Sequence, residues 1–220
     1  MATSYWEPYD DRMPWGRQDR AQDVIGAGIR DAGAKTVAVA ADFTRSDAPA
    51  ELFDAVERSL GSVTALVMAH CESVDSGILT TSIESFDRHF AVNARASWLL
   101  IRDFARRFRG SPGTGRIVAL TSDATVGNLP YGASKGALDR VVVAAARELA
   151  ELRITSNVIN PGPTDTGWMS AQMREELTIA NPRGRLGRGA DAASLVSFLC
   201  SPDGEWINGQ LLHSDGGLHS

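Results

Sequence analysis

The chain has 220 residues, of which 43% are hydrophobic, so it is long enough to bury one substantial core and falls within the size of a single domain. Its 22 basic and 27 acidic residues give a formal net charge of −5, and the basic residues are scattered, which excludes a concentrated surface for nucleic acid or anionic membrane. No apolar run is long enough to cross a bilayer, and the first residues resemble no signal peptide. We therefore expect one cytoplasmic domain over residues 1–220.

Helix-like and strand-like segments alternate from about residue 18 onward, which predicts βα units and a mostly parallel sheet. The strand-like segments lack alternating polar residues, as expected when helices cover both faces of a sheet. In chain order, the pattern predicts a helix over 18–32, a strand over 36–40, a helix over 48–60, a strand over 64–69, a long helix over 83–108, a strand over 116–121, a helix over 131–152, a strand over 155–159, helices over 170–177 and 191–200, and a last strand over 210–213.

Tyr131 and Lys135 are four residues apart at the start of a predicted helix, so both side chains project from one face. A free phenol has a pKa of about 10, but a nearby ammonium favours the phenolate and lowers that pKa. Lysine is rare here, at Lys35 and Lys135 alone, which favours a chemical reason for Lys135. Ser122 ends the preceding strand, at the sheet edge where ligands of such folds bind. The three residues predict proton exchange with a carbonyl or alcohol, although Tyr-x-x-x-Lys alone also describes an ordinary surface pair.

In its context, after Thr121-Ser122 and continuing as Gly-Ala-Ser-Lys, this pair resembles the catalytic segment of the short-chain dehydrogenase/reductase family. Four more segments match the family in order. They are the acidic turn at 41–44, the helix segment at 91–97, the Asn-Pro-Gly-Pro-Thr-Asp-Thr loop at 160–166, and the C-terminal segment at 208–217. The resemblance implies a Rossmann-like, doubly wound α/β fold and NAD(P)-dependent reduction of a carbonyl or oxidation of an alcohol.

The resemblance also implies a role for each matching residue. Tyr131 would be the general acid/base, Lys135 would lower its pKa and hold the nicotinamide ribose, Ser122 would orient the substrate carbonyl, and Asn93 would hold a water in the proton relay. NADP is favoured over NAD, and a homodimer or homotetramer is expected. The implied cofactor-binding residues are Asp42, Phe43, Ala69, His70, Tyr131, Lys135, Pro161, Gly162, Thr164 and Thr166.

The sequence departs from the family pattern at its start. The first strand and its glycine-rich turn are absent, and Gly26-Ala-Gly28 lies inside a predicted helix without the third glycine. Residues 1–17 are then a degenerate N-terminal segment, in which 2–6 would be what remains of the family's second strand. Because the missing βα unit normally binds the pyrophosphate, we expect weak dinucleotide binding. Two alternatives stay open: a non-catalytic homologue that binds a ligand or partner, and a start that lies inside a longer natural chain.

For several other residues, the sequence allows a structural role as well as a functional one. His70 stands where the family has asparagine, and a structural substitution is favoured over a proton relay. Trp98 and Phe104 are expected to be core or subunit contacts, and Trp168 either caps the substrate pocket or only packs. The stretch between Ser122 and Tyr131 is short, which puts the reach of Ser122 in question. No metal is assigned, because His89, His213 and His219 lack metal-ligand spacing, and the substrate is not revealed.

Overall fold

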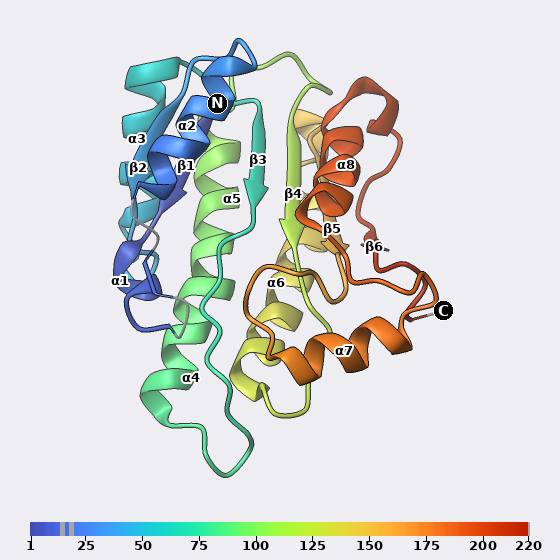
Figure 1. Ribbon diagram of the computed structural model, residues 1–220. Coiled ribbons are helices and arrows are strands. Elements are labelled where there is room, and N and C mark those ends of the chain that lie inside the picture. Colours follow the sequence, from blue (N-terminus) through green and yellow to red (C-terminus); the bar gives the residue numbers. More distant parts are fainter. Residues whose placement is uncertain (14–15, 18–19, 220) are drawn as a thin grey trace.

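The computed structural model describes residues 1–13, 16–17 and 20–219 (Figure 1). A π-helical stretch, Phe90–Arg95, joins α4 to α5, and short 3₁₀ turns follow α6 and α8. In chain order the elements are β1 (Ala2–Tyr5), α1 (Glu7–Asp10), α2 (Ala21–Asp31), β2 (Val37–Ala40), α3 (Ala48–Leu60), β3 (Ala65–Met68), α4 (Ile83–His89), α5 (Ala96–Arg107), β4 (Arg116–Leu120), α6 (Leu129–Glu148), β5 (Thr155–Asn160), α7 (Ala171–Ala180), α8 (Gly189–Cys200) and β6 (Leu211–His213).

These elements follow the order predicted from the sequence, with three differences. The long helix expected over 83–108 is interrupted by the π-helical stretch, which local periodicity does not reveal. The helix expected over 18–32 is Ala21–Asp31, and residues 18–19 lie outside the described part of the chain. In the N-terminal segment, β1 pairs in parallel with β2 from Ala2 to Tyr5, in agreement with the strand remnant expected over 2–6, and α1, which was not expected, follows it.

The strands are all parallel but form two separate sheets. One has the order β3-β4-β5-β6 and the other consists of β1 and β2. Helix α3 packs on α5 and α5 on α6, so these three helices form a layer behind both sheets, while α2 and α8 lie in front (Figure 1). The doubly wound, mostly parallel α/β fold expected from the sequence is therefore confirmed.

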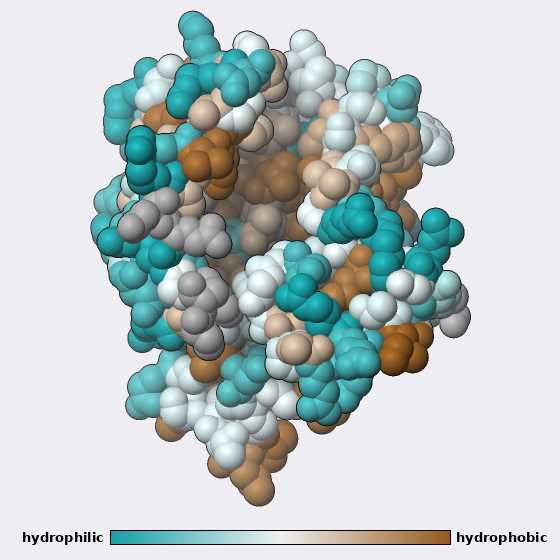
Figure 2. All heavy atoms as spheres, viewed as in Figure 1, coloured by the Kyte–Doolittle hydropathy of each residue, from teal (hydrophilic) through white to brown (hydrophobic). Residues whose placement is uncertain are grey.

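The two sheets are interrupted between β1 and β3. Among residues 1–13, 16–17 and 20–219, no strand pairs with the second edge of β1 or of β3. Every residue of β5 is buried, whereas Val67 of β3 is 46% exposed. Figure 2 shows a hollow with hydrophobic residues on its walls in the same region. The gap between the two sheets therefore exposes backbone and apolar side chains in a region that is normally buried in a parallel α/β fold.

The larger core lies between the sheets and the layer of α3, α5 and α6. Phe104 is almost fully buried in it beside Phe53 and Phe108, so its expected packing role is confirmed. Trp98, six residues earlier on α5, is 49% exposed and carries the Arg102 guanidinium over its ring. Within the described part of the chain, no helix is both long and apolar enough to cross a membrane.

Candidate active site

Tyr131 and Ser122 meet at the carboxyl edge of the larger sheet. Pro130 stands in the first turn of α6, where its lack of an N–H costs no helical hydrogen bond, and Tyr131 follows it. Just beyond β4, the Ser122 side chain lies close enough to the Tyr131 phenol to favour its ionised form, and the Ser122 hydroxyl accepts a hydrogen bond from the Ala124 amide at 3.2 Å. The short loop therefore does allow Ser122 to reach Tyr131.

The Tyr131 phenol is held in its protonated form. Burial raises its pKa well above the ordinary value, nearby Cys71 adds to the effect, and the hydrogen bond to Ser122 opposes it. This direction is opposite to the lowering expected from Lys135, because desolvation disfavours the phenolate more than the local donors favour it. The phenol therefore carries the proton that a general acid must carry near pH 7, and its raised pKa makes it a weaker acid than a free phenol.

Lys135 lies one helical turn after Tyr131 and is buried. Its Nζ donates hydrogen bonds to the Leu120 carbonyl at 2.9 Å and the His70 carbonyl at 3.5 Å, and it lies 5.8 Å from the centroid of the Tyr131 ring. Burial lowers the pKa of the ammonium. Lys135 therefore joins the ends of β3 and β4 beneath Tyr131, and its hydrogen bonds in this structure go to the backbone.

Asn93 is fully buried in the π-helical stretch. Its Oδ1 accepts a hydrogen bond from the Glu72 amide at 2.8 Å, while its Nδ2 donates to the Glu72 carbonyl and to the Ser134 hydroxyl, both at 2.9 Å. Irregular helical turns of this kind often occur at functional sites, where they aim a side chain that a regular helix would place elsewhere. Asn93 thus joins the loop after β3 to helix α6, directly behind Tyr131.

A cavity of about 280 Å³ opens between the ends of β1 and β3 (Figure 2), and Tyr131, Lys135, Ser122 and Asn93 are not among the residues that line it. It contains four of the expected cofactor-binding residues, Asp42, Phe43, Ala69 and His70, and Trp168 also lines it. Pro161, Gly162, Thr164 and Thr166 do not line this cavity. The adenine-side residues expected from the sequence are thus brought together, and the loop after β5 reaches the cavity through Trp168.

Asp42 and His70 have structural partners on the cavity wall. The Asp42 carboxylate accepts hydrogen bonds from the amide and hydroxyl of Thr44 at 2.9 and 2.7 Å, which shapes the turn after β2. The His70 ring packs against Phe43 with 4.7 Å between centroids, and its Nε2 lies 3.1 Å from the Val92 carbonyl. Burial, reinforced by the charge of Lys135, lowers the pKa of His70 to about 3, so the ring is neutral near pH 7. These contacts favour the structural reading of His70.

The N-terminal segment forms part of the site, which the sequence did not indicate. Arg12 donates to both carboxylate oxygens of buried Glu72, at 3.1 and 3.0 Å, and Arg88 lies 4.0 Å from the same carboxylate. The Tyr9 hydroxyl donates to the Ser73 carbonyl at 3.4 Å. Arg12 and Glu72 are 60 residues apart, and no local pattern connects them, so only the fold could reveal this pair.

The loop after β5 is fixed by the C-terminal segment. Gly162 has a φ of +61°, and a β-carbon there would approach the Asp215 Cβ to 2.5 Å. Its amide donates to Asn160 Oδ1 at 3.0 Å, and the Thr164 hydroxyl donates to its carbonyl at 3.2 Å. Two segments that matched the family separately in the sequence are therefore one structural unit.

Comparisons with known proteins agree with this geometry. The family model described as "Enoyl-(Acyl carrier protein) reductase" matches residues 15–219. The "uncharacterized oxidoreductase YjdA" of Bacillus subtilis (strain 168) is 38% identical over 202 residues, which cover 90% of this chain and 78% of that protein. The "NADPH-dependent aldehyde reductase 2, chloroplastic" of Arabidopsis thaliana is 35% identical over 194 residues, covering 83% of this chain and 71% of that protein.

A solved structure shows the same likeness in three dimensions. The short chain dehydrogenase of Burkholderia cenocepacia J2315, determined in complex with NADP, superposes with a TM-score of 0.85 at 27% identity, covering 100% of this chain and 87% of that one. The parallel sheet, with Tyr131 and buried Lys135 at its carboxyl edge, has the Rossmann-like fold of this structural neighbour. The chain belongs to the short-chain dehydrogenase/reductase family of oxidoreductases.

Proposed function

We propose that this chain catalyses NAD(P)-dependent hydride transfer between a nicotinamide and a carbonyl or alcohol, with Tyr131 as the general acid/base. The observation that carries the proposal is the placement of Ser122 beside the Tyr131 phenol at the carboxyl edge of the sheet, with Lys135 one turn further along α6 and its Nζ 5.8 Å from the centroid of the Tyr131 ring. Ser122 would orient the carbonyl oxygen, and Tyr131 would donate the proton to it. Nothing in the described part of the chain favours the non-catalytic alternative.

Lys135 and Asn93 would act through position. In the proposal Lys135, rigidly held by the carbonyls of Leu120 and His70, presents its charge beneath the ribose of the nicotinamide. A ribose hydroxyl bound there would replace one of these two carbonyls as a hydrogen-bond acceptor of Lys135 Nζ. Asn93 would hold the loop after β3 in a fixed position against helix α6. Its Oδ1 already accepts the Glu72 amide, so a relay water would donate to the remaining lone pair of that oxygen.

The cofactor-binding residues fit part of a dinucleotide. NAD(P) would supply or accept the hydride. In the proposal Asp42, Phe43, Ala69 and His70 form the wall on the adenine side, and Pro161, Gly162, Thr164 and Thr166 face the nicotinamide. The cavity wall carries two guanidinium groups, Arg12 and Arg88, whose charge suits phosphate and favours NADP, which carries one phosphate more than NAD.

Binding is expected to be weak in this form of the chain. In the part of the chain that the structure describes, β1 is followed by no glycine-rich turn of the family type to hold the pyrophosphate. Each charge-assisted hydrogen bond lost with that unit is worth about 1.5–3 kcal/mol, so losing two weakens binding by on the order of a hundredfold. Arg12 offsets this loss only in part, because Glu72 already holds its guanidinium.

We further propose a homodimer or homotetramer formed through α4, α5 and α6. Apolar side chains at Ile83, Phe86 and Trp98 stand exposed on the first two of these helices. Exposed apolar groups gathered on neighbouring turns are typical of a surface that a subunit covers.

The proposed activity is tested by mixing the purified chain with NADPH and a panel of aldehydes, ketones and alcohols, and following NADPH absorbance. Aldehydes come first, because the Arabidopsis relative is named an NADPH-dependent aldehyde reductase. Turnover that disappears in Tyr131→Phe supports the proposal. Turnover that persists in that variant contradicts the role of Tyr131.

A further inference from the structure

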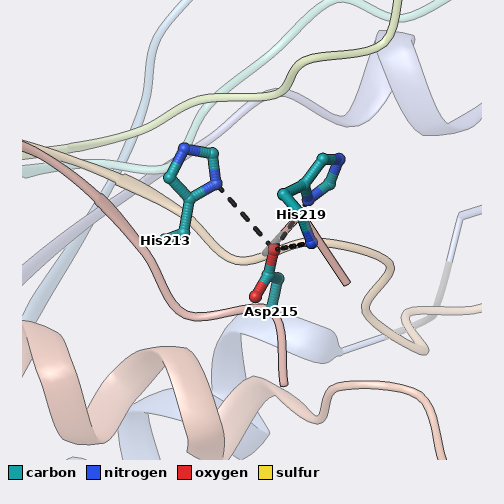
Figure 3. Close-up of side chains that lie close together, drawn as sticks. All are labelled: His213, Asp215 and His219. Carbon is teal, nitrogen blue, oxygen red and sulfur yellow. Dashed lines mark hydrogen bonds and ion pairs between the residues drawn. The ribbon is translucent and has the colours of Figure 1, made fainter. Parts of the chain in front are cut away.

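We propose that His213, Asp215 and His219 form a binding site for a divalent transition-metal ion of the zinc type. Figure 3 shows the three side chains converging at the end of β6 and in the C-terminal turn. Their ligand atoms all lie within 4.8 Å of one another. This cluster is separate from the Tyr131 site, and the proposal does not depend on the proposed activity.

The ligand set fits such an ion in number and chemistry. Two imidazole nitrogens and one carboxylate oxygen are ligands that zinc shares with other late transition metals, while magnesium and calcium prefer oxygen alone. In a tetrahedral zinc site, bonds of about 2.0–2.2 Å place neighbouring ligand atoms about 3.3–3.6 Å apart. Asp215 Oδ2 lies 3.9 Å from His213 Nδ1 and 2.6 Å from His219 Nδ1, so both separations are within about 1 Å of the required edge.

The central carboxylate is held in place before any metal arrives. Asp215 is almost fully buried, its Oδ1 accepts the Gly217 amide at 2.9 Å, and its backbone carbonyl accepts Asn181 Nδ2, also at 2.9 Å. Asp215 Oδ2 also accepts the His219 amide at 3.2 Å. The ligand that is hardest to reach from solvent is therefore fixed by hydrogen bonds to the backbone and to Asn181.

Asp123 completes the arrangement from a distant part of the chain. His219 is paired through Nε2 with the Asp123 carboxylate, and this leaves Nδ1 directed at Asp215. A metal-bound histidine usually donates its other ring N–H to a carboxylate in this way, which fixes the tautomer and strengthens the ligand. Nearby Arg185 does not oppose a cation strongly, because Asp191 binds it at 2.7 and 3.0 Å.

A metal in this position would have a defined structural effect. Asp123 follows Ser122 in the loop between β4 and α6, while His219 lies in the C-terminal turn. An ion bound by His213, Asp215 and His219 would restrict the motion of that turn. Through the His219–Asp123 pair it would also restrict the loop that carries Ser122. Without the ion, the turn is held by the bonds of Asp215 with the Gly217 amide, the His219 amide and the His219 ring, and by the His219–Asp123 pair.

The test uses the full chain without a histidine tag, treated with a chelator and then titrated with Co²⁺ and Zn²⁺. We expect one ion per chain, visible as d–d absorption for Co²⁺ and as a binding isotherm for Zn²⁺. His213→Gln changes a partly exposed residue and should abolish this stoichiometric binding while the protein stays folded. Asp123→Asn keeps all three ligands and should weaken binding about 10- to 100-fold.

His70→Gln serves as the matched control, because His70 lies in the cavity between the ends of β1 and β3, away from the cluster. This variant should bind the ion like the unchanged chain. Failure to bind either ion stoichiometrically would overturn the proposal and leave the cluster as a hydrogen-bonded turn. Unchanged binding in His213→Gln would also overturn it, because the ion would then be held elsewhere.

Discussion

The β-carbon of an alanine at position 132 would overlap the carbonyl oxygen of Ala124. Gly132 directly follows Tyr131, and Ala124 belongs to the loop that begins at Ser122, so the glycine lets the serine loop lie against the first turn of α6. This contact explains why a residue without a side chain stands inside a helix, where glycine is otherwise unfavourable.

Gly132→Ala should therefore push the Ser122 loop away from Tyr131. We expect kcat for carbonyl reduction to fall at least about tenfold, since general acid/base assistance of 10²- to 10⁴-fold depends on this alignment. Gly136→Ala is the matched control, because a β-carbon there meets no atom within 4 Å. It should leave kcat unchanged and raise stability by up to about 1 kcal/mol. Equal kcat in both variants would show that the contact does not position Ser122.

Tyr131→Phe should remove nearly all turnover and keep the fold. The hydroxyl is the only group deleted, and a loss of about 10²- to 10⁴-fold in kcat is expected for a general acid. Circular dichroism and thermal unfolding would establish that the variant is folded. Ser122→Ala should cost less than Tyr131→Phe, because the phenol keeps its proton when the hydrogen bond from Ser122 is gone. The opposite ranking would assign the main role to Ser122.

His70, half-buried on the cavity wall, should make stability depend on pH. Its folded pKa of about 3 lies below the value of about 6.5 expected in an unfolded chain. Between these values the unfolded chain binds a proton that the folded chain does not, so the free energy of unfolding falls as the pH falls from about 6.5 towards 3. The steepest contribution is about 1.4 kcal/mol per pH unit.

His70→Gln keeps a polar side chain at this position and removes the titration. Urea unfolding between pH 7.5 and 5 should therefore give a shallower loss of stability for His70→Gln than for the unchanged chain. Parallel curves for the two proteins would show that His70 stays accessible to protons in the folded state.

Trp98→Glu should disrupt self-association. Trp98 is exposed on α5, so a carboxylate in its place would be buried in any subunit interface that this helix forms. Burying an unpaired charge has a large desolvation cost, which destabilises the assembly. Light scattering should give a dimer or tetramer for the unchanged chain and a smaller species for the variant, each folded by circular dichroism. A monomer in the unchanged chain at micromolar concentration would contradict the proposed assembly.

A strand, glycine-rich turn and helix joined ahead of Met1 should improve both cofactor affinity and stability. The free edges of β1 and β3 would gain a partner, and the pyrophosphate would gain backbone N–H donors. We expect NADPH affinity, followed by nicotinamide fluorescence, to rise about a hundredfold and the melting temperature to rise with it.

A control segment with alanines in place of the turn glycines should raise the melting temperature without restoring affinity, because only the close approach of backbone to phosphate is lost. Micromolar NADPH binding by the 220-residue chain alone would show that a rearranged site already anchors the phosphates.

The sequence by itself determined the elements and their local chemistry. Apolar runs gave the strands of the larger sheet, helical periodicity gave α3 from Ala48 to Leu60, and four-residue spacing placed Tyr131 and Lys135 on one face of α6. These properties depend on neighbours along the chain, so a pattern can reveal them.

Tertiary structure decided what depends on neighbours in space. Desolvation outweighed the expected effect of Lys135 and raised the pKa of Tyr131, since burial is a property of the whole fold. The pairs Arg12–Glu72 and His219–Asp123 join segments far apart in sequence, and no spacing rule could connect them. The separation of β1 from β3 is likewise a property of the tertiary structure. The sequence of a strand does not determine whether another strand pairs with its second edge.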